Sequence, residues 1–243
     1  MPRVHNRLVR PDFRIRCAAE TLPPMRRADR ATTETTAGSV LSAGLTLRVN
    51  GRRLNAQVYW PDGTYPTCGS ALIFLPALTD AEDSNSLRRV LCSAAASVVL
   101  ALPSPWVTDH DDELAALGWA VEHAADLGAQ SEQLMVAGQG TGGAHAARLA
   151  IRARDAGWPP LRRQILVYPA FTQTCPMPFL LTGVAPATVI SSDTRIDEGS
   201  TYAARLRASG IEVNVLRFSP PILPGHDALS TALARRNGHM SSA

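Results

Sequence analysis

The 243-residue chain is predicted to form an α/β domain whose mostly parallel sheet begins with an antiparallel hairpin and carries helices on both faces. Three observations predict this fold. Two segments of alternating polarity flank Asn50-Gly51, a dipeptide that is typical of hairpin turns. Short, continuous apolar runs follow, and such runs are typical of strands buried on both faces. Stretches of helical period separate these runs, so we expect strand and helix to alternate along the chain.

The elements follow one another in a regular order. Alternation predicts the hairpin strands at 45–49 and 54–60, and the apolar runs predict strands at 71–75, 97–102, 133–137, 161–168, 188–191 and 211–216. Helical periodicity predicts helices at 84–96, 109–127, 142–156, 197–208 and 226–236. The helix at 109–127 begins with acidic residues, which the helix dipole favours in a first turn. Functional groups are then expected on the loops at the carboxyl ends of the strands.

The first part of the chain differs in composition from the rest. Residues 1–38 are dense in arginine between Arg3 and Arg30 and show no apolar period, so we interpret them as a basic, solvated segment ahead of one domain at 39–243. A nucleic-acid partner is not expected, because the net charge is only +3 and Phe13 is the one aromatic residue of this segment available for base stacking.

Cysteine usage and hydropathy indicate a compartment. Cys17, Cys68, Cys92 and Cys175 form no C-x-x-C pair and have no metal-ligand spacing, so we expect reduced thiols and no metal site. No apolar run reaches the roughly 18 residues of a membrane-spanning helix. The first residues also lack the apolar segment of a secretory signal. These features favour a cytoplasmic location.

A glycine-rich turn at 138–143 follows one predicted strand and opens the next helix, and it matches two motifs. The first is the dinucleotide fingerprint G-x-G-x-x-G at Gly138, Gly140 and Gly143. That fingerprint belongs in the first strand–helix unit of its domain, whereas two such units precede it here. The acidic residue expected about 20 residues later is also missing, since 167–170 reads Val-Tyr-Pro-Ala. Dinucleotide binding at this turn stays an alternative.

The second motif is the nucleophile elbow G-x-S-x-G, a strained turn between a strand and a helix. Gly138 and Gly142 are its outer glycines, and Gly140 occupies the place of the serine. Glycine tolerates a positive φ, so the geometry of the elbow is expected to persist. The nucleophilic hydroxyl is absent.

Several blocks in the same order resemble the hormone-sensitive-lipase-like (bacterial acetyl-esterase) family of the α/β-hydrolase fold, over roughly residues 44–238. The elbow resembles the family's G-D-S-A-G-G, and residues 193–199 resemble its D-P-L-x-D-E-G segment. The resemblance implies that Asp193 takes the place of the catalytic acid and His226 that of the catalytic base. Further matching blocks lie at 111–123, 150–154, 164–169 and 202–206.

The chain also departs from the family pattern. Leu75, Pro76, Ala77 and Leu78 replace H-G-G-G, whose backbone amides form part of the oxyanion hole. The proline removes one of those donors. The region at 169–186 is much shorter than in the family, so we expect a reduced or absent cap.

These features predict an esterase-like protein that is catalytically degenerate and binds a small acyl-ester-like ligand or a partner protein, without a cofactor. The sequence predicts no particular oligomeric state. One alternative is an active hydrolase of short acyl esters that uses a non-standard nucleophile or an activated water. The other is dinucleotide binding at Gly138–Gly143.

Overall fold

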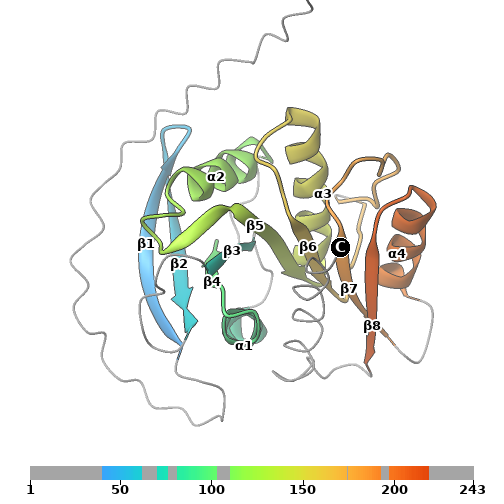
Figure 1. Cartoon of the computed structure of the whole chain (residues 1–243), viewed down its shortest axis with the longest axis horizontal. Helices are drawn as coiled ribbons and strands as arrows, with labels where there is room; N and C mark the ends of the chain where they lie inside the picture. The colour runs from blue at the N-terminus through green and yellow to red at the C-terminus, as the bar shows by residue number, and fades with distance from the viewer. Residues whose placement is uncertain are drawn as a thin grey trace, which may run out of the picture.

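Eight strands form one sheet in the order β1-β2-β4-β3-β5-β6-β7-β8, with helices packed on it (Figure 1). The computed structural model describes residues 40–61, 70–75, 81–102, 110–173, 175–192 and 197–218. The strands are β1 Leu41–Val49, β2 Arg52–Trp60, β3 Ser70–Leu75, β4 Val98–Ala101, β5 Ala129–Gln139, β6 Arg163–Val167, β7 Ala187–Ser192 and β8 Val213–Phe218. The helices are α1 Ala81–Ala94, α2 His110–Glu122, α3 Thr141–Ala156 and α4 Glu198–Ala208.

The predicted N-terminal hairpin is confirmed. β1 and β2 pair antiparallel, with Leu47 opposite Leu54, around a two-residue turn. Asn50 and Gly51 in that turn have φ values of 49° and 78°, the left-handed conformation that asparagine and glycine accept most readily. The turn is also tied to α2, because Asn50 Nδ2 donates to Asp112 Oδ1 at 3.0 Å.

The remaining six strands run parallel, and β4 joins them to the hairpin through its antiparallel pairing with β2. Because parallel strands end at the same edge of a sheet, the segments that follow β4, β5, β6 and β7 all start from one edge. The elbow follows β5, and the predicted acid Asp193 comes after β7 in the chain, so both segments begin at this edge.

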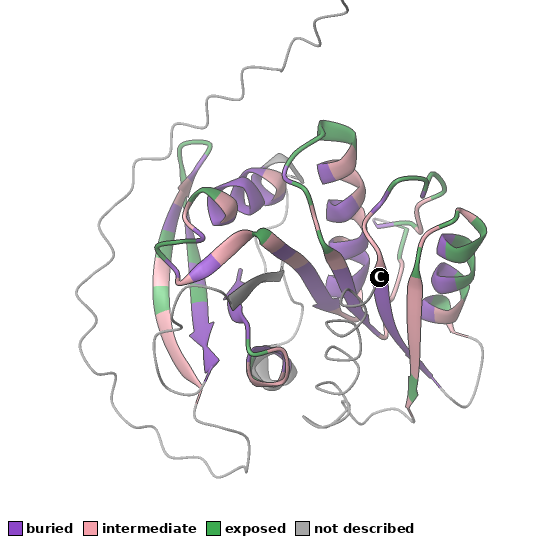
Figure 2. Ribbon diagram, viewed as in Figure 1, coloured by how far each residue is buried: buried purple, intermediate pink, exposed green. Residues whose placement is uncertain are grey.

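Strand side chains alternate between two buried layers, as predicted for a sheet covered on both faces. Val98 and Leu100 belong to the buried layer that also contains side chains of α2, α3 and α4, whereas Val99 and Ala101 belong to the layer that contains side chains of α1. Figure 2 shows the central strands buried, with the buried sides of the helices turned toward them. The helices expected on both faces are thus confirmed (Figure 1).

Some element bounds differ from those expected. β5 is longer than the predicted strand at 133–137, since it already pairs with β3 at Ala129. The strand expected at 161–168 is shorter, and it ends at Val167 because Tyr168 has a φ of 44°, outside the β region. The predicted helix at 226–236 and the basic segment at 1–38 lie outside the described residues. In the part of the chain that the structure describes, no helix has the length and apolar character needed to cross a membrane.

Candidate functional site

The glycine-rich turn has the strand–turn–helix geometry of a nucleophile elbow. β5 ends at Gln139 and α3 begins at Thr141, so Gly140 alone makes the reversal. Its φ of 55° and ψ of −126° form a conformation that residues with side chains rarely adopt. The predicted elbow residues Gly138, Gly140 and Gly142 are therefore brought together in one tight turn.

Packing explains the glycines at positions 138 and 143, and backbone conformation explains the one at position 140. A Cβ on Gly138 would lie 2.2 Å from the carbonyl oxygen of Gly142, and one on Gly143 would lie 3.1 Å from Pro169. Among the residues that the structure describes, no atom lies within 4 Å of where a Cβ on Gly140 would be. A side chain at position 140 therefore has room to project from the turn, at the cost of a strained backbone.

The end of β6 holds the elbow in place. The amide of Gly140 donates to the carbonyl of Val167 at 2.9 Å, and its carbonyl accepts from the amide of Ala170 at 2.8 Å. Between these two contacts lies Tyr168, whose positive φ turns the chain so that Pro169 packs on Gly143. The same proline contacts the start of α4, where a Cβ on Gly199 would lie 3.1 Å from its Cδ.

Asp197 organises the segment that follows β7. It is the N-cap of α4, and its carboxylate accepts hydrogen bonds from the Ser191 hydroxyl at 2.5 Å and from the amides of Ser192 and Ser200, each at 2.8 Å. Partial burial acts to raise the pKa of Asp197. The hydrogen bonds from Ser191 and from the two amides outweigh burial and hold the pKa below its usual value. The carboxylate therefore links the end of β7 to the first turn of α4.

Three parts of the predicted site fall outside the described residues: Asp193, His226, and the Pro76-Ala77-Leu78 stretch of the altered oxyanion loop. Leu75 is the last residue of β3, at the same sheet edge as the elbow. The roles of Asp193 as acid, of His226 as base and of residues 75–78 as a degenerate oxyanion loop stay predictions. The neighbouring Asp197 was not singled out by sequence analysis, although an aspartate directly before a predicted helix is a typical N-cap.

A buried charged cluster between α2 and α3 was also missed. Glu113 of α2 has 1% of its side chain exposed, and its Oε1 lies 3.0 Å from His145 Nδ1 on α3. Its Oε2 lies 3.7 Å from Nη2 of Arg148, beyond hydrogen-bond range. The same Nη2 lies 2.9 Å from His145 Nδ1. Glu113, His145 and Arg148 are called the α2–α3 charge cluster below.

Cys175, on the loop that follows β6, interacts electrostatically with two members of the α2–α3 charge cluster. Burial raises the pKa of this thiol, Arg148 acts to lower it, and Glu113 acts to raise it. A thiol in this state is a poor nucleophile. Within the described ranges, no three histidine, cysteine or acidic residues are arranged to hold a metal ion.

The acidic run at 111–113 was the signal for the α2–α3 charge cluster. The sequence alone accounts for these acids through the helix dipole. Asp112 and Glu113 are instead buried and paired, Asp112 with Arg52 at 3.0 Å and Glu113 with α3. Two buried acids in one first turn require cationic partners, but nothing in the sequence indicates which elements supply them.

Known proteins are similar to this chain in sequence and in fold. Residues 78–179 match the model of a protein family described as having the α/β-hydrolase fold. The esterase LipI of Mycobacterium tuberculosis (strain ATCC 25618 / H37Rv) is 30% identical over 185 residues, which is 71% of this chain and 55% of that protein. The chain has the α/β-hydrolase fold and is similar in sequence to esterases. The predicted resemblance to hormone-sensitive-lipase-like esterases is thereby confirmed.

A second curated relative is similar over part of its length. The carboxylesterase NlhH of Mycobacterium tuberculosis (strain CDC 1551 / Oshkosh) is 30% identical over 172 residues, 52% of this chain and 54% of that protein. The chain thus spans about half the length of the curated relatives that it matches.

Solved structures agree on the fold. A mutant of the esterase rPPE complexed with (S)-Ac-CPA superimposes with a TM-score of 0.70 at 21% identity, covering 88% of this chain and 87% of that one. EstE1, a thermophilic carboxylesterase cloned from a metagenomic library, has a TM-score of 0.68 at 23% identity, with 83% and 90% covered.

Proposed function

We propose that this chain is an esterase-like protein that does not hydrolyse esters and instead binds a small acyl-ester-like ligand at its elbow. The observation that carries the proposal is Gly140. It has the strained conformation of an elbow residue and open space where a side chain would project, yet it supplies no hydroxyl. A cytoplasmic location, as expected from the sequence, is part of this proposal.

The chemistry of acyl transfer supports the same conclusion. The reaction requires a nucleophile, a base that activates it and donors for the oxyanion. Cys175 is a weak substitute nucleophile, because burial raises the pKa of its thiol. Pro76 in the predicted oxyanion loop has no amide hydrogen to donate. Loss of one such donor alone typically lowers the rate by about 10²–10³-fold.

Glycine packing favours the elbow interpretation over dinucleotide binding. Gly138 is required by the carbonyl of Gly142, and Gly143 is required by Pro169, so contacts within the protein account for both. In a dinucleotide fingerprint, the glycines are required by the approach of a pyrophosphate. The strand end that would carry the ribose-binding acid is instead followed by Tyr168 and Pro169, and Pro169 packs on the turn.

The first experiment is hydrolysis of p-nitrophenyl acetate and p-nitrophenyl butyrate by four proteins: wild type, His226→Ala, Gly140→Ser, and the double variant. We expect no difference between wild type and His226→Ala. We expect Gly140→Ser to gain weak hydrolysis and to be labelled by a fluorophosphonate, and the added His226→Ala change to remove both. Wild-type hydrolysis that disappears in His226→Ala would instead establish an active esterase.

Ligand binding is tested separately with N-(4-nitrophenyl)butanamide, an amide counterpart of the butyrate ester. We expect it to raise the thermal midpoint of the wild-type protein and to have less effect on a Gly140→Phe variant, whose ring would fill the open space at the turn. Stabilisation by NAD but not by the amide would identify a dinucleotide site instead.

A further inference from the structure

Two large apolar side chains project from the loop between β6 and β7. Phe179 is 86% exposed, and the next residue, Leu180, is 72% exposed. Trp158, which follows the end of α3, is a third large apolar residue with an exposed surface. Isolated exposed apolar residues need no explanation, but two adjacent ones on the same loop form a protruding apolar knob.

The knob is held in place by contacts on its inner side. Leu181, the next residue, and Val184, three residues further on, are buried. Nη1 of Arg154, in the last turn of α3, donates to the carbonyl of Leu180 at 2.8 Å and to that of Thr182 at 2.9 Å. The backbone of the loop is therefore fixed to α3, and its fixed geometry keeps Phe179 and Leu180 outside the core.

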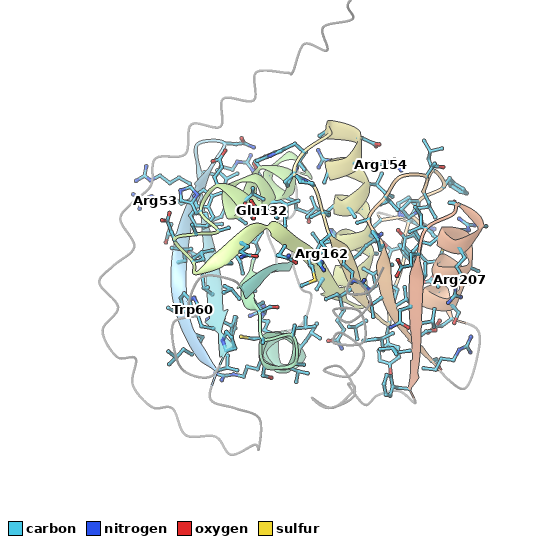
Figure 3. All side chains as sticks on the ribbon, in the orientation of Figure 1. Arg53, Trp60, Glu132, Arg154, Arg162 and Arg207 are labelled. Atoms are coloured by element: carbon cyan, nitrogen blue, oxygen red, sulfur yellow. The ribbon has the colours of Figure 1, made fainter. Side chains whose placement is uncertain are left out.

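Positive charge lies beside the knob. The guanidinium of Arg205 lies over the ring of Phe179, 5.2 Å from its centroid. Arg205 and Arg207 both lie in the last turn of α4, whose one acidic residue is Glu198 in its first turn. Asp155, at the end of α3, is already paired with Arg154 at 2.7 Å. Figure 3 labels Arg154 and Arg207, which come from the two helices on either side of this loop.

The knob lies away from the elbow. Gly140 precedes the first residue of α3, and Arg154 lies in the last turn of that 16-residue helix. A helix of this length spans about 24 Å, so the two features lie near opposite ends of α3. A partner that covers the knob would leave the elbow open.

We propose that Phe179 and Leu180 insert into the interface of an anionic lipid surface while Arg205 and Arg207 contact its phosphate groups. The argument rests on shape and charge. A protein partner would need a pocket complementary to a convex pair, whereas the headgroup–acyl boundary accepts any short apolar projection. Arg205 beside the projection, and Arg207 in the same helical turn, add attraction to anionic headgroups. Docking is shallow and reversible, because the apolar contact consists of few side chains.

The test uses the full chain and sedimentation with vesicles of phosphatidylcholine alone or mixed with phosphatidylglycerol. We expect binding only to the mixed vesicles, with weakening as salt is raised. The Phe179→Ser/Leu180→Ser variant is expected to bind at least about tenfold more weakly, because burying either side chain is worth more than a factor of ten. Arg205→Ala should weaken binding several-fold. Arg53→Ala, on β2 at the far side of the molecule (Figure 3), is the charge-matched control and should not.

A second readout follows insertion itself. In a Phe179→Trp variant, brominated lipids in the bilayer should quench the fluorescence of the added tryptophan. In an Arg53→Trp variant, the fluorescence of the added tryptophan should be unaffected. Equal binding of wild type and Phe179→Ser/Leu180→Ser would overturn the proposal, since the arginines between residues 3 and 30 would then carry the attraction. A concentration-dependent dimer that is lost in the same variant would also overturn it and assign the knob to a second copy of the chain.

Discussion

The buried carboxylate of Glu113 and the guanidinium of Arg148 both approach Nδ1 of His145, at 3.0 Å and 2.9 Å. A carboxylate only accepts hydrogen bonds and a guanidinium only donates them, so one ring nitrogen cannot serve both. With the proton on Nδ1, His145 donates to Glu113, and Arg148 is left to the second carboxylate oxygen at 3.7 Å. The three side chains therefore act as one unit that joins α2 to α3, the helix that begins at the elbow.

The α2–α3 charge cluster predicts an asymmetry between its members. The side chain of Glu113 is 1% exposed, whereas those of His145 and Arg148 are 22% and 17% exposed and can reach water. His145→Ala should therefore cost about 3 kcal/mol of unfolding free energy, because it leaves a buried carboxylate poorly compensated. Glu113→Leu should cost clearly less. Urea unfolding measures both, and an equal or reversed order would contradict the assignment of the charges.

Gly138 is predicted to tolerate no side chain. The methyl group of Gly138→Ala would lie 2.2 Å from a backbone oxygen of the same turn, and backbone cannot move aside as a flexible side chain can. We expect a loss of at least about 3 kcal/mol, or no folded protein. Soluble yield and the urea midpoint report this, and a variant of wild-type stability would show that the turn is more open than described.

Gly140 should behave differently from Gly138. Gly140→Ala meets open space but must hold a φ of 55°, so we expect a cost of about 1–2 kcal/mol with the fold retained. Gly44→Ala is the matched control, because Gly44 also faces open space and has no positive φ. The control should change the unfolding free energy by less than about 0.5 kcal/mol. Equal effects of the two substitutions would argue against backbone strain at position 140.

The lowered pKa of Asp197 leads us to expect that the free energy of unfolding depends on pH. Its pKa is lowered from the usual 3.8, so the ionised form is bound more favourably in the folded state. That stabilisation is complete above the unfolded pKa and is lost as the pH falls through the lower folded pKa. Asp197→Asn should cost about 1–2 kcal/mol at neutral pH, and the difference from wild type should shrink below pH 3.8. Urea midpoints measured from pH 7 to pH 3 test this, and a constant difference would refute it.

Much of the fold could be predicted because its signals are local. The hairpin depends on Asn50 and Gly51, and the parallel strands depend on apolar runs such as 97–102, where each residue faces one of two buried layers. The elbow was predictable for the same reason, since Gly138, Gly140 and Gly142 are close in sequence. Strand bounds were less accurate, because the end of β6 is set by the conformation of Tyr168, which no local pattern indicates.

The parts of the site that were missed depend on long-range contacts. The α2–α3 charge cluster joins Glu113 to residues 32 and 35 positions later, and the pairing follows from how two helices meet on the sheet. The network around Asp197 was within reach, because Ser191, Ser192 and Ser200 lie within a few residues of it. The family resemblance points to Asp193 as the acid and gives no signal for the cap at Asp197.

Pro169 packs against a glycine in the first turn of α3 and another in the first turn of α4. Added Cβ atoms on Gly143 and Gly199 would each lie 3.1 Å from this proline. Substitutions at these three positions are therefore coupled. A larger residue at either glycine requires Pro169 to shift, and that shift changes the packing of Pro169 on the other helix. Directed-evolution libraries that aim to restore or redirect chemistry at this elbow should therefore keep residues 143, 169 and 199 fixed. Diversity is better placed at Gly140, where the surrounding space is open.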